Sequence, residues 1–183
     1  KVKMTGLSAA FPLLVIGSNV QVLPGTLDIK TLDAGVPVRN IQLLMHTDFT
    51  EAYVSNLHAD VLGAAVQTTD FTYNLDQQSA QFEVQVTQLP VADVLLLESE
   101  DIRGDGILDG NLSVVLSSIG TAITEGKLIS RAPGGSLAYL GNLPETNPGL
   151  SLAIKALRNF VYRAMEIDVN LVPEGDLKLL VKL

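Results

Sequence analysis

The sequence predicts a mainly β protein, a large, curved and mostly antiparallel sheet that forms a trough, with one or two short helices. Three observations support this prediction. Apolar and polar residues alternate with a period of two along most of the 183 residues. Clusters of turn-forming residues separate the alternating runs. Helical spacing is found in only two places, and sheets of many strands curl because each strand is twisted.

The N-terminal half contains two alternating runs. The first sets Leu27 and Ile29 against Asp28 and Lys30. The second is longer and predicts a strand whose apolar face carries Ile41, Leu43, Met45, Thr47 and Phe49. The segments 24–25 and 35–37 contain Gly and Pro and are typical of turns between strands, so we expect no domain boundary here.

The middle of the chain predicts a hairpin, a short helix and a further strand. The hairpin's first strand carries Phe71, Tyr73 and Leu75, residues 76–79 form the turn, and Phe82, Val84 and Val86 follow. Residues 91–97, after Pro90, fit about two turns of helix. The next apolar row consists of Leu108, Leu112, Val114 and Leu116.

The C-terminal part predicts a helix and a second hairpin. After Pro148, apolar residues at helical spacing are Leu150, Ile154 and Leu157. The hairpin begins with the row Val161, Met165, Ile167, Val169 and Leu171, which Arg163 interrupts. Residues 173–176 form a turn, and Leu177, Leu179, Val181 and Leu183 resume the alternation.

The composition indicates more apolar surface than a compact domain needs. Hydrophobic residues make up 47% of the chain and charged residues only 17%, against about 25% charged in an ordinary domain. A packed core under a surface of uncharged polar residues is the alternative reading. The net charge is −8 and the basic residues are scattered, which excludes the clustered positive face that nucleic acid needs. The chain has no Trp, and its aliphatic side chains suit acyl chains at least as well as flat ring ligands.

No pattern in the sequence predicts catalysis, a metal site or a cofactor. The glycine-rich segment 104–110 is followed by a strand-like run and not by the helix that a phosphate loop requires. The acidic residues 98–109 lack the spacing of a calcium loop. Cys is absent, and His46 and His58 lack zinc-ligand spacing. We therefore expect a protein that is not an enzyme.

The order of several motifs resembles the YdbH family of AsmA-like and TamB-like proteins, in its C-terminal region. The most distinctive run is G-x-G-x-L-D-G-x-L at 104–112, followed by G-x-L at 126–128 and A-P-G-G-S-L-x-Y at 132–139. Upstream, L-D-x-G-V-P-V-x-N-I at 32–41, A-D-V-L-G at 59–63 and F-T-Y-N at 71–74 also resemble that family, as does A-L-x-N-F at 156–160. Departures are Ala64, Asn74 and Ser113.

The resemblance implies a fragment, residues 1–183, of a longer periplasmic protein of a Gram-negative bacterium, anchored in the inner membrane. Its single β-groove would carry phospholipid between the inner and outer membranes. It also implies a small outer-membrane lipoprotein as a partner that joins by strand addition.

Residue pattern and resemblance together predict an apolar face that binds phospholipid acyl chains. The expected lining consists of Ile41, Leu43, Phe71, Tyr73, Phe82, Val84, Val86, Leu112, Val114, Leu116, Met165, Ile167, Val169, Leu171, Leu177, Leu179 and Val181. Two alternatives stay open: an assembly module that pairs with a partner through its sheet edge around a closed core, and a module that binds small acids in a basic pocket. Alternation alone leaves open whether the sheet closes, forms a sandwich or stays an open trough.

Overall fold

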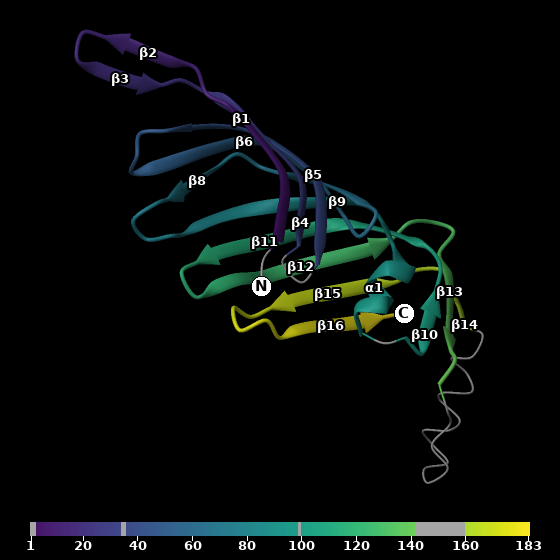
Figure 1. Ribbon diagram of the computed structural model, residues 1–183. Coiled ribbons are helices and arrows are strands. Elements are labelled where there is room, and N and C mark those ends of the chain that lie inside the picture. The colour runs from purple at the N-terminus through teal and green to yellow at the C-terminus, as the bar shows by residue number, and fades with distance from the viewer. Residues whose placement is uncertain (1–2, 34–35, 99, 142–159) are drawn as a thin grey trace.

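The computed structural model describes residues 3–33, 36–98, 100–141 and 160–183, and an eleven-stranded antiparallel sheet dominates it (Figure 1). Ten strands follow one another in the order β1-β4-β5-β6-β7-β9-β11-β12-β15-β16, and β8 pairs with β6 beside this path. The sheet does not close on itself, because β1 and β16 are its two edges. Its strands are β1 (Lys3–Ala10), β4 (Gly25–Asp33), β5 (Pro37–Thr47), β6 (Glu51–Val61), β7 (Ala64–Thr68), β8 (Phe71–Asn74), β9 (Ala80–Pro90), β11 (Ile107–Ser117), β12 (Gly120–Ser130), β15 (Glu166–Leu171) and β16 (Leu177–Lys182).

The remaining elements are small. A hairpin of β2 (Leu13–Ile16) and β3 (Asn19–Val22) forms a two-stranded sheet of its own. One helix, α1 (Val91–Glu98), lies next to a three-stranded sheet of β10 (Ile102–Gly104), β13 (Gly135–Tyr139) and β14 (Phe160–Tyr162). The prediction of a curved, mainly antiparallel trough with a short helix at 91–97 is confirmed. The second predicted helix, with Leu150, Ile154 and Leu157, lies outside the described residues.

The main sheet is curled, and its strand direction turns along its length. In Figure 1, β1, β4 and β5 run across the direction of β11, β12, β15 and β16. Three residues with positive φ coincide with shifts of register between strands, at Asn40 in β5, Asn56 in β6 and Gln88 in β9. Bulges of this kind add a residue to one strand, bend it and increase its twist. They explain much of the curvature.

Strands β7 and β8 together occupy one position in the sheet. Residues 58–61 of β6 pair with β7, and residues 51–54 of the same strand pair with β8. The predicted turn between β8 and β9 is present, with a bridge between Asn74 and Ser79. β8 nevertheless pairs over a longer stretch with β6 than with β9. The predicted hairpin of β8 and β9 therefore contains less strand pairing than expected.

Helix α1 and the small sheet β10-β13-β14, together called the cap, pack against one part of the main sheet. Val91 of α1, Leu108 of β11 and Ile167 of β15 are almost completely buried in one hydrophobic cluster. Leu137 of β13 and Tyr162 of β14 belong to the same cluster. The cap therefore provides the second layer that a sheet needs to bury its apolar face.

Two residues were placed wrongly from the sequence. Phe49 lies in the β5–β6 turn with φ at 72° and is exposed, because the Asp48 carboxylate accepts hydrogen bonds from the backbone N–H groups of Thr50 and Glu51 and thereby ends the strand. Val161 is exposed and its neighbour Tyr162 is buried. The apolar row of this segment changes phase before Met165, so Val161 does not belong to it.

Candidate functional site

The candidate site is one face of the main sheet, called the apolar face below. In an antiparallel ladder, directly opposite residues point to the same side of the sheet. Phe82 and Val84 of β9 lie opposite Val114 and Leu112 of β11. The polar residue between them, Glu83, points to the other side together with its partner Ser113, which donates a hydrogen bond of 2.6 Å to the Glu83 carboxylate. The alternation of the sequence thus becomes two chemically different faces.

The apolar face continues to the C-terminal edge. Leu112 lies opposite Gly126 of β12, and Gly126 lies opposite Val169 of β15. Val169 in turn lies opposite Leu179 of β16. The register places the remaining predicted lining residues of these strands on the same face: Val86, Leu116, Ile167, Leu171, Leu177 and Val181. Met165 precedes β15 and is buried in the same cluster.

The apolar face also continues toward the N-terminal edge. Val86 lies opposite Val66 of β7, which lies opposite Ala59 of β6. In the other half of β6, Val54 lies opposite both Met45 of β5 and Phe71 of β8. The predicted residues Ile41 and Leu43 lie opposite Ile29 and Leu27 of β4, and Tyr73 lies opposite Ala52. The Phe71 and Phe82 rings stack at 4.2 Å between centroids.

Several residues of this face were missed by sequence reasoning. Leu27, Ile29 and Met45 had been recognised as alternating but were not assigned to the lining. Val54 and Val66 were not singled out at all. In β6 the bulge at Asn56 shifts the phase, so that Ala59 and Val54 share a face despite their odd spacing. A strict period of two cannot identify such residues.

The apolar face is packed in one part and accessible in another. Under the cap, Val86, Leu128 and Ile167 are 5%, 4% and 1% exposed. In β4 and β5, Leu27, Ile29, Leu43 and Met45 are only half-buried, although Ile41 between them is buried. In the edge strand β1, Leu7 is exposed. Aliphatic side chains in this second part are therefore available to an apolar ligand.

One polar group on the apolar face has no partner. Thr68 of β7 is 8% exposed, and its hydroxyl makes no hydrogen bond. Its register partner is Val84. A buried hydroxyl without a partner costs roughly 1–3 kcal/mol, so this position is a local weakness in an otherwise hydrocarbon surface.

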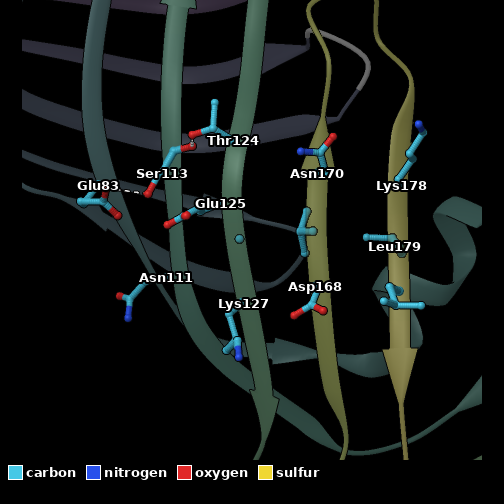
Figure 2. Close-up of a pocket in the computed structure, with 13 residues that line it drawn as sticks. Glu83, Asn111, Ser113, Thr124, Glu125, Lys127, Asp168, Asn170, Lys178 and Leu179 are labelled. Atoms are coloured by element: carbon cyan, nitrogen blue, oxygen red, sulfur yellow. Dashed lines mark hydrogen bonds between the residues drawn. The ribbon is translucent and has the colours of Figure 1, made fainter.

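The opposite face of the C-terminal strands is polar and charged. Figure 2 shows Glu83, Ser113, Lys127 and Asp168 on successive strands around a depression of about 590 Å³. The Lys182 ammonium lies 3.0 Å from the Glu166 carboxylate and 2.6 Å from that of Asp168, and it lowers the pKa of both acids. Of the two lysines that line the depression, Lys127 lies 3.2 Å from the Glu166 carboxylate, and Lys178 pairs with no acid among the described residues. The lining also carries the carboxylates of Glu83, Glu125 and Asp168, so it offers a small acid one free ammonium among acids and not the cluster of basic groups that would hold it.

Residues of the most distinctive sequence motif and their partners fix the segments that connect the sheet to the cap. Arg131 forms an ion pair with Asp109 that lowers the pKa of this carboxyl, and Asp109 Oδ1 also accepts a hydrogen bond of 2.8 Å from the backbone N–H of Gln88. The Gln88 bulge is fixed in this way. The Tyr162 hydroxyl donates a hydrogen bond of 2.6 Å to the carbonyl of Asp105. A Cβ added at Gly134, whose φ is 99°, would collide with the backbone of Tyr162.

The described part of the chain has neither a cluster of metal-binding side chains nor a helix that could span a membrane. No cluster of three or more His, Cys, Asp or Glu residues suited to a metal is found among residues 3–33, 36–98, 100–141 and 160–183. Within the same ranges, no helix has the length and hydropathy needed to cross a bilayer. The distinctive chemistry of the described chain is thus its extended apolar face.

Comparison with known proteins identifies one family. The family model "YdbH-like: Intermembrane phospholipid transport protein YdbH" matches residues 2–183. Searches of curated proteins and of solved structures find no match. The family match covers all strands of the apolar face as well as the cap.

Proposed function

The chain belongs to the YdbH-like family of intermembrane phospholipid transport proteins, and from this premise we propose that its apolar face binds phospholipid acyl chains and guides them along the sheet. The place of action would be the periplasm, between the inner and outer membranes, with the full-length protein held at the inner membrane. The protein would act as a conduit and not as an enzyme.

The observation that carries this proposal is the continuity of the apolar face across the open sheet. Every strand from β4 to β16 on the main path contributes to it. The other side is mainly polar, with the exposed Leu44, Ile129 and Leu180 as exceptions. Its half-buried members leave hydrocarbon accessible in the part outside the cap. We propose that the lining residues in direct contact with lipid are the half-buried ones, such as Leu43, Tyr73 and Phe82. Met165 and Ile167 would support the sheet from within the core.

The energetics favour acyl chains as cargo. Each methylene group that leaves water for an aliphatic surface contributes about 0.8 kcal/mol. A chain that lies along the apolar face would therefore avoid most of the cost of leaving a bilayer. Movement along the face requires similar affinity at successive positions, and repeated Leu, Val and Ile side chains provide this. No cluster of charges on this face would fix a headgroup.

The experiment compares two adjacent leucines of β5. Leu43 lies on the apolar face opposite Leu27, and Leu44 lies on the other face opposite Thr26. Phospholipid that co-purifies with the wild-type chain is measured by native mass spectrometry and lipid extraction. We expect Leu43→Asp to lower the recovered phospholipid several-fold and Leu44→Asp to leave it nearly unchanged. Circular dichroism checks that both variants are folded.

Two outcomes would contradict the proposal. The first is a wild-type chain that carries no phospholipid when prepared from bacterial membranes. The second is an equal loss of lipid in both variants, which would mean that the effect does not depend on the face.

An assembly role through the sheet edge is the second candidate, because β1 and β16 both have one unpaired side. An extended segment of a small outer-membrane lipoprotein would add to such an edge through backbone hydrogen bonds. In that case the amides of β16 that point away from β15 should exchange with deuterium more slowly once the partner strand is bound. Unchanged exchange in the presence of saturating partner would exclude this edge.

A further inference from the structure

The hairpin β2–β3 stands outside the main sheet. Its two strands pair only with each other, and Figure 1 shows it projecting away from the body of the molecule. A backbone hydrogen bond of 2.8 Å from Leu23 N–H to the Pro12 carbonyl continues the pairing of β1 with β4 into the hairpin. Gly17, with φ at 63°, forms its turn together with Ser18. The hairpin is thus an extension of the β1–β4 ladder beyond the sheet.

One side of this hairpin is entirely aliphatic and faces water. Leu13 lies opposite Val22, and Val15 lies opposite Val20, so these four side chains share one side. Leu13, Val15 and Val20 are 61%, 63% and 57% exposed. The other side also carries two large aliphatic residues, Leu14 and Ile16, both exposed. Soluble proteins rarely leave such a patch open unless it meets a membrane or a partner.

The absence of charged residues in the hairpin indicates whether its aliphatic patch meets a membrane or a protein partner. Residues 4–27 contain no charged side chain. At the same end of the sheet the β5–β6, β8–β9 and β15–β16 turns contain Asp48, Asp76, Glu174 and Asp176, and only the two-residue β11–β12 turn, residues 118–119, is also uncharged among the described turns there. A protein interface typically surrounds its apolar centre with polar and charged residues. The hairpin has one aliphatic side, a second side on which Leu14 and Ile16 lie opposite Gln21 and Asn19, and no charged rim, which matches the boundary between the headgroups and the acyl chains of a bilayer. With no basic residue in the hairpin, attraction to anionic lipids plays no part.

We propose that the β2–β3 hairpin inserts into the interfacial layer of a zwitterionic phospholipid bilayer. The insertion is shallow, because a two-stranded ribbon leaves its outer N–H and C=O groups unpaired and these need water or headgroups. This proposal concerns contact between the hairpin and a bilayer, whereas the proposed function concerns acyl chains bound to the apolar face. Each of the two can fail without the other.

The test uses the natural lack of Trp in the chain. Val15→Trp places a single fluorophore on the aliphatic side of the hairpin. Val161→Trp, on the equally exposed Val161 of β14, is the matched control. With vesicles of phosphatidylcholine and phosphatidylethanolamine, we expect a blue shift and quenching by brominated lipid for Val15→Trp only. The signal should not weaken as the salt concentration rises.

A second variant tests the chemistry of insertion. Val15→Asp should lower vesicle binding about tenfold, since it removes an aliphatic group and adds a charge. Asn111→Asp adds the same charge on the polar face and should leave binding unchanged. If Val15→Asp still co-purifies with phospholipid, the loss of vesicle binding belongs to the hairpin and not to the cargo face.

Three results would overturn the proposal. The first is the absence of a shift for Val15→Trp with vesicles, or an equal shift for the control. The second is a shift that needs no vesicles and grows with protein concentration, which would assign the hairpin to a second copy of the chain. The third is binding that requires anionic lipid and is lost in salt.

Discussion

The capped and uncapped parts of the apolar face have the same side-chain chemistry but different surroundings. Under α1 and β10-β13-β14, residues such as Leu108 and Ile167 form a closed protein core. In β4 and β5, Leu27 and Leu43 carry the same aliphatic groups at the same alternating positions and are half-buried. The difference teaches that alternation specifies a face, whereas the presence of a second layer decides whether that face becomes a core or stays accessible.

The largest expected effect tests this comparison directly. Leu108 is 0% exposed, so Leu108→Ala should lower the free energy of unfolding by about 2–5 kcal/mol through lost burial and a cavity. Leu43→Ala, in the uncapped part, should lower it by about 1 kcal/mol or less. Urea denaturation of both variants measures the difference. Equal losses would mean that the uncapped part is packed as tightly as the capped part.

A smaller effect is expected at the ends of β9 and β12, where the chain leaves the main sheet for the cap. Asp109→Asn weakens the contact with Arg131 and the support of the Gln88 bulge, both partly exposed to solvent. We expect a loss of about 0.5–1 kcal/mol in the free energy of unfolding. Asp168→Asn, in a surface ion pair with Lys182, serves as the control and should change it by less.

This effect should depend on pH in one direction. Arg131 lowers the pKa of Asp109 below its ordinary value of 3.8 in the folded protein. The stabilisation is therefore complete above about pH 5 and is lost as the pH falls through the lowered pKa, because the unfolded chain takes up the proton first. The stability of Asp109→Asn should approach that of the wild type in acid. A gap that widens on acidification would contradict the pairing.

The smallest effect should have the opposite sign. Thr68→Val keeps the shape of a buried side chain and removes its unpaired hydroxyl, so we expect the free energy of unfolding to rise by up to about 1 kcal/mol. Thr72→Val, at an exposed position of β8, is the control. Thermal melting measures both. Destabilisation by Thr68→Val would show that the hydroxyl has a partner in solution.

The sequence predicted the strands that keep a strict period of two. In β9, β15 and β16 the residues Val84, Val169 and Leu179 lie on the apolar face, as their alternation required. The short helix after Pro90 was also predicted within one residue. These elements are predictable because each satisfies a local rule of spacing and turn chemistry.

Other features depend on backbone conformations that alternation does not encode. The bulges at Asn40 and Asn56 shift the apolar rows of β5 and β6 by one residue, because non-glycine residues there adopt positive φ. Tyr162 becomes buried through its hydrogen bond to Asp105, 57 positions earlier in the chain. The apolar segment 13–16 gave no sign from the sequence alone that it would leave the sheet. Burial by the cap is likewise a tertiary effect.

Because the sheet is open at β1 and β16, the extent of the apolar face across the strands depends on the number of strands. Neighbouring strands lie about 4.8 Å apart, so the ten strands of the main path measure roughly 40 Å across, somewhat more than the roughly 30 Å hydrocarbon core of a bilayer. An additional strand at β1 or β16 would lengthen this distance by one spacing without altering any side chain already in place. The reach of such a path can therefore evolve by repetition, independently of the chemistry along it.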